Sequence, residues 1–307
     1  MRTRIRNAFL SKINTIGLPI LALCWVSFFW GTTWIASKEG VKYMPAFQLA
    51  GIRQGIGGIL YVSYFLFKKE PWPKGKQWKT ILILSVLNFV FSNGLSTWGV
   101  KYISSGLGAI IGAIFPLWIV LITLFSGGRI ARLSILGLVV SFGGVCVIFY
   151  DHLSDFLLPD FRFGIFISIV STLTWAFGSL YIKKKASSFN PYFSLGLQMF
   201  LSSILLFAFT GATGTSVSLS SIPMISWLSI AYLVIIGSIL TFIAFIYALQ
   251  NLPAEINSIY AYINPIVAVI LGTIIFDEPL TIALGIGGGV TLFGLYMVNY
   301  SLRKGRR

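Results

Sequence analysis

Long apolar runs fill nearly the whole length of this chain. Glycine, proline, lysine or aspartate separates one run from the next. The ten runs cover residues 16–37, 46–67, 78–98, 105–126, 133–150, 162–183, 191–211, 224–249, 256–276 and 281–300. A helix needs about 20 apolar residues to cross the hydrocarbon core of a bilayer. The runs therefore predict an all-α integral membrane protein with ten transmembrane helices.

The composition excludes a soluble protein of this size. Only 10% of the 307 residues are charged and 56% are hydrophobic, whereas soluble domains carry about 25% charged residues. The net charge is +15, but the basic residues form short clusters between apolar runs, which fits membrane lipids as partners and not nucleic acid. The two cysteines, Cys24 and Cys146, lie in separate runs, so we expect no disulfide, no metal site and no cofactor.

The distribution of lysine and arginine predicts the orientation. With a cytoplasmic amino terminus, Lys38, Lys42, Lys101 and Arg162 lie outside and Arg53 lies within a run, which leaves 18 of the 23 basic residues inside (23 − 5). Cytoplasmic segments of membrane proteins carry this excess. We therefore expect both termini in the cytoplasm. In the absence of an organellar signal, we expect a multi-pass protein of a bacterial inner membrane.

The second half of the chain repeats the first. A shift of 145 residues places Trp30 on Trp175, and a shift of 149 places Pro116 on Pro265. Five helices per half is an odd number, so the second half must enter the membrane inverted, as in many secondary transporters. The expected organisation is a basic cytoplasmic segment 1–15, a first repeat 16–150, an external loop 151–161, a second repeat 162–300 and a basic cytoplasmic segment 301–307.

Both halves also resemble a known family. The resemblance rests on FFWGTTWIASK, LAGIRQGIGG and WGVKYISSGLGAIIGAIFPLWIVLI in the first half, and on LQMFLSS, YALQNLPAEINSIYAYINPIVAVILG and DEPLTIALG in the second. These segments are similar to two EamA domains of the drug/metabolite transporter superfamily, over about residues 17–300. The resemblance implies a carrier of amino acids, other metabolites or drugs. One position departs from the family pattern, because the first half has Arg129 where the second half has Glu278.

Two tryptophan-bearing faces are candidates for the transport route. Helical spacing of i, i+3, i+4 and i+7 places four residues of the first run on one face. They are Ser27, Trp30, Gly31 and Trp34. The corresponding face of the sixth run carries Trp175 and Ser179. Small and polar residues let a ligand or another helix approach closely. We expect a central substrate route; helix packing is the alternative, and for Trp34 a place in the aromatic belt.

Polar residues in other runs extend this candidate route. Asn93 and Trp98 lie in the third run, Tyr247 in the eighth, and Tyr260 and Asn264 in the ninth. A buried asparagine must find a hydrogen-bonding partner, so each amide faces either a ligand or a neighbouring helix.

Pro116 and Pro265 occupy matching places in the two halves. A proline inside a helix frees a backbone carbonyl and bends the helix. We interpret the two as hinges of pathway-lining helices, with static kinks as the alternative.

Arg53 is the one charged residue well inside a run. Charges inside membranes are expensive and mark functional sites by default. We consider a substrate carboxylate as its partner, and a purely structural role as the alternative. No aspartate or glutamate lies deep in any run, so facilitated diffusion or exchange is a simpler mechanism than proton-coupled antiport.

Together these features predict an alternating-access secondary transporter, which exports small amphipathic metabolites such as neutral, apolar or aromatic amino acids. A carrier of a drug-like compound, nucleoside or sugar derivative, and a non-transporting receptor or scaffold, are the alternatives. The sequence lacks paired intramembrane aspartates, a Ser/His couple and an H-E-x-x-H motif, so we expect no catalytic residues and no enzyme activity. A monomer and a homodimer are both compatible with the sequence.

Overall fold

The structure is a computed structural model that describes residues 2–127, 131–184, 189–252 and 259–304. Within these residues all regular structure is helical. The first half comprises α1 (Arg2–Gly40), α2 (Ala46–Phe67), α3 (Lys76–Leu84), the π-helix η1 (Ser85–Asn93), α4 (Gly94–Gly99), α5 (Ser105–Ala113), α6 (Phe115–Phe125) and α7 (Arg132–Asp151). The second half comprises α8 (Pro159–Lys184), α9 (Pro191–Ala212), α10 (Met224–Tyr232), the π-helix η4 (Leu233–Leu240), α11 (Thr241–Asn251), α13 (Tyr260–Phe276) and α14 (Ile282–Lys304). Two short 3₁₀ turns, η2 (Asp155–Leu157) and η3 (Leu219–Ser221), lie in loops.

The all-α membrane class is confirmed. In the described part of the chain, eight helical stretches are long and apolar enough to cross a membrane. The apolar helix α13 is shorter, with 17 residues, and α2 has 22 residues but carries Gln48, Arg53 and Gln54. The count of ten spans therefore stays a prediction, although each predicted run falls on helix in the described residues.

Three of the predicted runs are interrupted helices. Runs 78–98 and 224–249 each contain a π-helical stretch, η1 and η4, and such stretches are frequent at functional sites. Run 105–126 breaks at Ile114, between α5 and α6, with Pro116 in the first turn of α6. Proline is favoured there because the first turn of a helix leaves its N–H groups unpaired.

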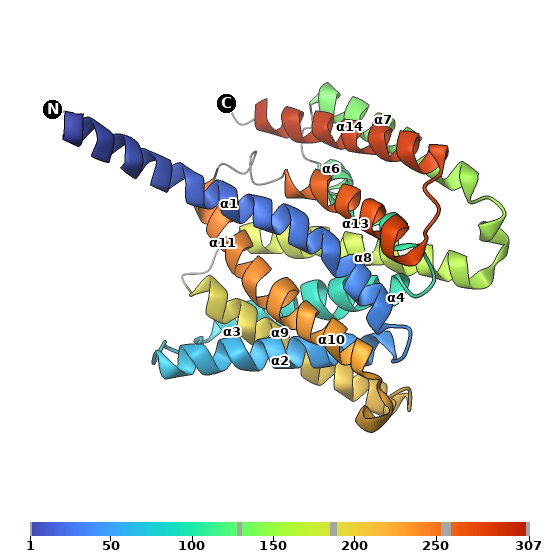
Figure 1. Cartoon of the computed structure of the whole chain (residues 1–307), viewed down its shortest axis with the longest axis horizontal. Helices are drawn as coiled ribbons and strands as arrows, with labels where there is room; N and C mark the ends of the chain where they lie inside the picture. The colour runs from blue at the N-terminus through green and yellow to red at the C-terminus, as the bar shows by residue number, and fades with distance from the viewer. Residues whose placement is uncertain (1, 128–130, 185–188, 253–258, 305–307) are drawn as a thin grey trace.

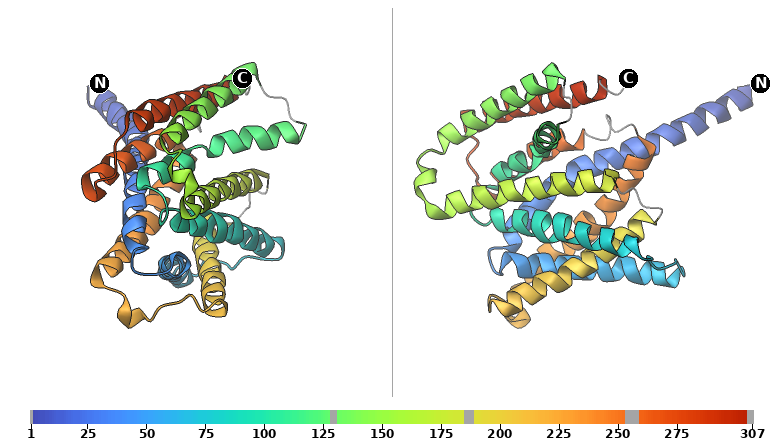
Figure 2. Two further views of the ribbon diagram at one scale, coloured as in Figure 1. Left: turned by 90° about the vertical axis from the view of Figure 1, so that its right-hand side faces the viewer. Right: turned by 180° about the vertical axis from the view of Figure 1, so that it is seen from behind.

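The helices form three layers (Figures 1 and 2). α7 and α14 lie side by side along one edge of the molecule, and α2 and α9 lie at the opposite edge. Between them, α1 packs against α13, α10 and α11, while α8 packs against α5, α6, η1 and α4. The middle layer holds the candidate site.

Glycines allow close contact within the edge pairs. A Cβ atom on Gly137 of α7 would lie 2.7 Å from the carbonyl oxygen of Gly294 in α14. At the other edge, a Cβ atom on Gly58 of α2 would lie 2.8 Å from the Cα of Phe200 in α9. Small residues permit this backbone approach between membrane helices.

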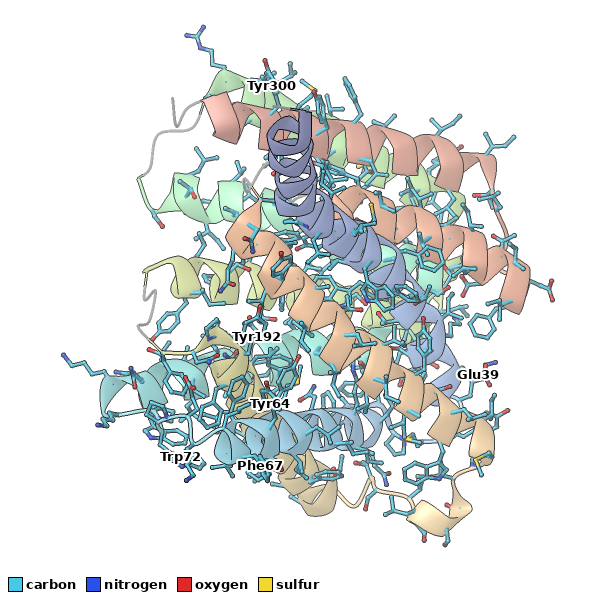
Figure 3. All side chains as sticks on the ribbon, turned by 60° about the vertical axis from the view of Figure 1, so that its left-hand side comes forward. Glu39, Tyr64, Phe67, Trp72, Tyr192 and Tyr300 are labelled. Carbon is cyan, nitrogen blue, oxygen red and sulfur yellow. The ribbon has the colours of Figure 1, made fainter. Side chains whose placement is uncertain are left out.

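The outer surface is apolar, as a surface that contacts lipid requires. Phe67 is 91% exposed and Phe125 is 89% exposed. Aromatic side chains gather where α2 ends and α3 begins, among them Tyr64 and Trp72 (Figure 3). The Trp72 ring stacks on Trp78 with their centroids 6.1 Å apart. Such clusters are typical of the membrane–water interface.

Candidate functional site

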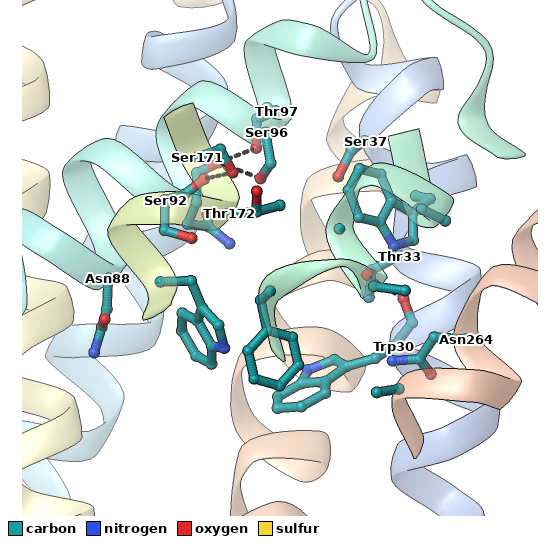
Figure 4. Close-up of a pocket in the computed structure, with 18 of the residues that line it drawn as sticks. Trp30, Thr33, Ser37, Asn88, Ser92, Ser96, Thr97, Ser171, Thr172 and Asn264 are labelled. Atoms are coloured by element: carbon teal, nitrogen blue, oxygen red, sulfur yellow. Dashed lines mark hydrogen bonds between the residues drawn. The ribbon is translucent and has the colours of Figure 1, made fainter. Parts of the chain in front are cut away.

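A cavity of about 190 Å³ lies in the middle layer, between α1, η1, α4, α5, α6, α8, α11 and α13, with Arg53 of α2 in its wall. Eight of the residues singled out in the sequence line it: Trp30, Trp34, Arg53, Asn93, Trp175, Tyr260, Asn264 and Pro265. The other predicted residues lie outside this lining. Figure 4 shows one wall with Trp30, Thr33 and Asn264, and the facing wall with Asn88, Ser92, Ser171 and Thr172.

The wall contributed by α1 is a stripe of alternating aromatic and hydroxyl side chains. Trp30, Thr33, Trp34 and Ser37 line the cavity, and their spacing of i, i+3, i+4 and i+7 places them on one face. This face is rotated from the predicted one, which contained Ser27 and Gly31 in place of Thr33 and Ser37.

Ser27 and Gly31 serve packing in the structure. The Ser27 hydroxyl donates a hydrogen bond to the carbonyl oxygen of Leu23, at 2.7 Å. Gly31 faces α13, where an added Cβ would lie 2.7 Å from the Cβ of Val267 and 2.9 Å from the carbonyl oxygen of Asn264. The glycine therefore sets the close approach of α1 to α13.

The Trp30 indole lies in an aromatic cluster at the cavity wall. Its ring centroid is 5.1 Å from that of Phe242, 4.9 Å from Phe245 and 5.3 Å from Tyr260. Its Nε1–H donates to the carbonyl oxygen of Gly237 at 3.4 Å. The contacts with Phe242 and Tyr260 are edge-to-face and the contact with Phe245 is tilted. Such contacts favour particular ring orientations, so the cluster offers a well-packed apolar surface.

Trp34 faces the interior of the bundle. An added Cβ on Gly112 would lie 2.9 Å from Cζ2 of Trp34, and one on Gly108 would lie 3.0 Å from Cζ3. The indole therefore packs on the glycine face of α5 and lines the cavity, where the aromatic-belt interpretation would place it against lipid.

Asn93 lies in an interhelical hydrogen-bond network. Gln54 of α2 donates from Nε2 to Asn93 Oδ1 and to the carbonyl oxygen of Phe89, each at 3.1 Å. Ser202 of α9 donates to Gln54 Oε1. The network ties α2 and α9 to the π-helix η1, and Asn93 lines the cavity beside it.

The facing wall comes from α8. Ser171 donates to the carbonyl oxygen of Ser92 at 2.9 Å, and Trp118 Nε1 donates to Thr172 Oγ1 at 2.9 Å. Both hydroxyls line the cavity, as does Trp175. α8 is thereby fixed to η1 and to α6 on either side of the cavity.

Three buried polar groups at the cavity have unfilled hydrogen-bonding capacity. Asn88 Oδ1 and Asn264 Oδ1 are buried and accept no hydrogen bond from any described residue. Arg53 is 5% exposed, and its Nε donates to Ser238 Oγ at 2.9 Å. Among the described residues no carboxylate forms an ion pair with Arg53.

The remaining predicted residues lie around the cavity. Trp98 packs edge-on between Phe47 and Phe163, with centroids 5.1 and 4.9 Å away. Ser179 lies one turn beyond Trp175 on α8, and Tyr247 lies on α11. Pro116 lies in the first turn of α6 and is not part of the lining, although its neighbour Phe115 is; Pro265 lies inside α13 and lines the cavity. Arg129 lies outside the described residues.

Two segments of the chain, residues 17–150 and 162–300, match the EamA-like transporter family. The chain belongs to this family. It is 26% identical over 284 residues to the uncharacterized inner membrane transporter YedA of Escherichia coli K12, covering 92% of this chain and 90% of that protein. It is 28% identical over 294 residues to the uncharacterized transporter YvbV of Bacillus subtilis strain 168, covering 91% and 90%.

The similarity extends to plants and to a solved structure. The WAT1-related chloroplastic protein At3g02690 of Arabidopsis thaliana is 24% identical over 282 residues, which cover 89% of this chain and 67% of that protein. A crystal structure shares the fold with a TM-score of 0.62 at 15% identity, over 91% of this chain and 96% of its own. The EamA protein described here is thus a multi-pass membrane transporter and not an enzyme.

Proposed function

We propose that this EamA protein is an alternating-access secondary transporter that exports small amphipathic metabolites, neutral apolar and aromatic amino acids among them, across a bacterial inner membrane with both termini in the cytoplasm. The observation that carries the proposal is the cavity in the middle layer. Its walls combine aromatic rings with amides and hydroxyls, and its lining comes from both halves of the chain.

The contacts between helices support two halves related by a two-fold axis. The second helices of the halves, α2 and α9, pack on each other, and so do the last helices, α7 and α14. The contact of α1 with α13 has its counterpart in the contact of α8 with α5 and α6. An inverted repeat predicts these pairs, because exchanging the halves returns the same contacts.

The two π-helices support the same symmetry. η1 begins at Ser85 and η4 at Leu233, and the repeat shift of 149 residues carries Ser85 onto Val234. Exchange of conformations between two such halves converts a cavity open to one side into a cavity open to the other. Alternating access is the natural mechanism of this architecture.

The lining favours an amphipathic substrate over a phosphorylated one. A phosphate or nucleotide diphosphate calls for several cationic donors, and Arg53 is the cationic residue of the lining among the described residues. The lining there also holds no aspartate, glutamate or histidine. This supports facilitated diffusion or exchange as the mode of transport, because a proton relay needs a titrating group in the membrane.

Counterflow in proteoliposomes tests the proposal. Vesicles containing the purified protein are loaded with unlabelled phenylalanine, leucine, uridine or glucose, and entry of the labelled compound is followed. We expect trans-stimulated entry of the amino acids, and weak or no stimulation for glucose. Stimulation by uridine alone would favour the alternative solute class. A flat response to the whole panel would favour a receptor or scaffold and contradict transport of this kind.

A further inference from the structure

We infer that Arg53 is the anion-binding group of the cavity, which binds the carboxylate of the transported molecule, and that Asn264 accepts a hydrogen bond from the donor group of the same molecule. This inference rests on the proposed function and names the chemistry of its substrate: a small carboxylate that carries an apolar or aromatic tail and, beside the carboxylate, a hydrogen-bond donor such as an ammonium group.

The charge on Arg53 lacks a protein counter-ion in the described part of the chain. The ion pairs described there join Lys38 to Glu278, Lys42 to Glu39 and His152 to Asp155. All three lie at helix ends or in loops. A buried guanidinium without an anion is strongly unfavourable unless a ligand or water completes its environment. The side chain is 5% exposed and lines the cavity, so an anion in the cavity is the group that can complete it.

The donor geometry of Arg53 leaves the guanidinium fork available. Arginine has five N–H donors in a planar fork that matches a carboxylate in a bidentate manner. Its Nε is bound to Ser238 Oγ at 2.9 Å, which holds the side chain in place from η4. In the described structure the two Nη groups have no hydrogen-bond acceptor. The outer edge of the fork is therefore free to bind a ligand.

Gly237 gives the guanidinium its position against α1. A Cβ atom on Gly237 would lie 3.1 Å from Nη2 of Arg53 and 2.9 Å from Cγ2 of Thr33. The carbonyl oxygen of the same glycine accepts the Nε1–H of Trp30 at 3.4 Å. Arg53 thus reaches the part of the cavity wall that Trp30 and Thr33 form, where an aromatic surface lies beside the cation.

Asn264 approaches the same turn of α1 from the other side. Its backbone carbonyl oxygen would lie 2.9 Å from a Cβ on Gly31. Gly31 and Thr33 flank Trp30 on the helix, because successive residues turn by about 100°. Figure 4 shows Asn264 beside Trp30 and Thr33. A charged donor group on Arg53 and an amide group on Asn264 therefore flank one indole.

The unpaired oxygen of Asn264 indicates which kind of group completes it. Nearly all buried polar atoms in proteins have a hydrogen-bond partner, and Asn264 Oδ1 has none among the residues that the structure describes. An oxygen can only accept, so its missing partner is a donor. Asn88 Oδ1 on the facing wall is unpaired too. A zwitterion with an apolar side chain supplies an anion for Arg53, a donor for an amide oxygen and a surface for Trp30.

Three matched probes test the inference: phenylalanine, phenylalaninamide, which lacks the carboxylate, and 3-phenylpropanoate, which lacks the ammonium group. Each is used as a competitor of labelled phenylalanine in proteoliposomes containing the full chain. We expect the wild-type protein to bind phenylalanine on the order of tenfold or more tightly than the amide, the loss that a charge-assisted hydrogen-bonded pair predicts. Equal competition by the acid and the amide would overturn the inference without any variant.

The Arg53→Gln variant should lose this discrimination. We expect its affinity for phenylalanine to fall about tenfold or more, while its affinity for phenylalaninamide changes little. Arg53→Lys keeps the charge and loses the fork, and we expect an intermediate effect. The Asn264→Leu variant should bind phenylalanine more weakly than the wild-type protein does, and its affinity for 3-phenylpropanoate should stay unchanged. Lys42→Gln is the matched control, since it also removes one positive charge but at an exposed helix end, where Lys42 pairs with Glu39; its selectivity should stay within about threefold of wild type.

A structural role for Arg53 gives a different result. Arg53→Gln would then weaken the binding of all three probes to the same extent and lower the thermal stability of the protein. That outcome would contradict the inference. If Arg53→Gln does not fold, the comparison of acid and amide on the wild-type protein still decides. If the wild-type protein exchanges phenylalanine but shows no preference for it over phenylalaninamide, this inference is contradicted and the proposed function is not. An absence of exchange for every compound contradicts the proposed function and this inference together.

Discussion

Lys38 at the end of α1 forms an ion pair with Glu278 in the loop between α13 and α14, with 3.4 Å between Nζ and Oε1. The Glu278 carboxylate also accepts hydrogen bonds from the backbone N–H and the hydroxyl of Ser105, each at 2.7 Å. It therefore caps the first turn of α5, where unpaired N–H groups favour an anion. Glu278 thus links the end of α1, the start of α5 and the loop between α13 and α14. This link lies about one helical turn from the contact of Trp34 with α5.

Replacing Glu278 should loosen this end of the bundle. Glu278→Gln removes the charge from a capping acceptor and from the ion pair, so we expect a loss of about 1–3 kcal/mol in stability, measured by thermal unfolding in detergent. Glu39→Gln is the matched control, because Glu39 near the end of α1 pairs with Lys42 in the turn that follows, at an exposed site, where such pairs contribute little. Equal shifts in both variants would contradict the capping role of Glu278.

The contact of Trp34 with α5 should be sensitive to a single methyl group. In Gly112→Ala the added Cβ would lie 2.9 Å from the indole, so Trp34 must shift, and because it lines the cavity the shift changes the cavity wall. We expect a several-fold slower exchange in counterflow. Gly143→Ala is the control, because nothing lies within 4 Å of its added Cβ. A Gly112→Ala protein that exchanges at the wild-type rate would show that Trp34 does not border the route.

Gln54 should be the most sensitive polar residue of α2 for stability. It is 1% exposed and bonds Asn93, the carbonyl of Phe89 and Ser202. Gln54→Leu leaves buried polar atoms without partners, each of which costs about 1–3 kcal/mol.

A double-mutant cycle with Ser202→Ala measures the coupling within this network. We expect the two effects to be non-additive, because both residues belong to one hydrogen-bond network. Strict additivity of the two losses in stability would argue against the network.

Transport should proceed without a pH gradient. In the described part of the lining, Arg53 and Tyr260 are the titratable side chains, and no carboxylate or histidine accompanies them. We expect counterflow rates to be the same with and without an imposed gradient. Accumulation of substrate that requires the gradient would contradict this mechanism and point to a titrating group outside the described lining.

The sequence predicts the membrane class and much of the cavity because aromatic and polar residues in apolar runs have few other uses. It does not predict the rotation of α1, since Trp30 and Trp34 belong equally to a face with Ser27 and Gly31 and to a face with Thr33 and Ser37. Only the packing of Gly31 on α13 decides between the two faces.

Long-range contacts are the other gap between the sequence and the site. Trp98 is polar at one end and could have faced a ligand, but Phe47 and Phe163 enclose it. Glu278 and Ser105 are 173 residues apart, and the family pattern identifies the glutamate without its partner. Ser171 was not predicted either. A single hydroxyl in an apolar helix does not indicate whether it lines a cavity or packs against a neighbouring helix.

Access to the cavity from both sides of the membrane tests the central claim most directly. Ser92→Cys places one thiol in the lining, after Cys24 and Cys146 are replaced by alanine. A membrane-impermeant thiol reagent is applied to right-side-out and to inside-out vesicles, with and without phenylalanine. Alternating access predicts labelling from both sides, at rates that substrate changes. Labelling that stays confined to one side under every condition would contradict it.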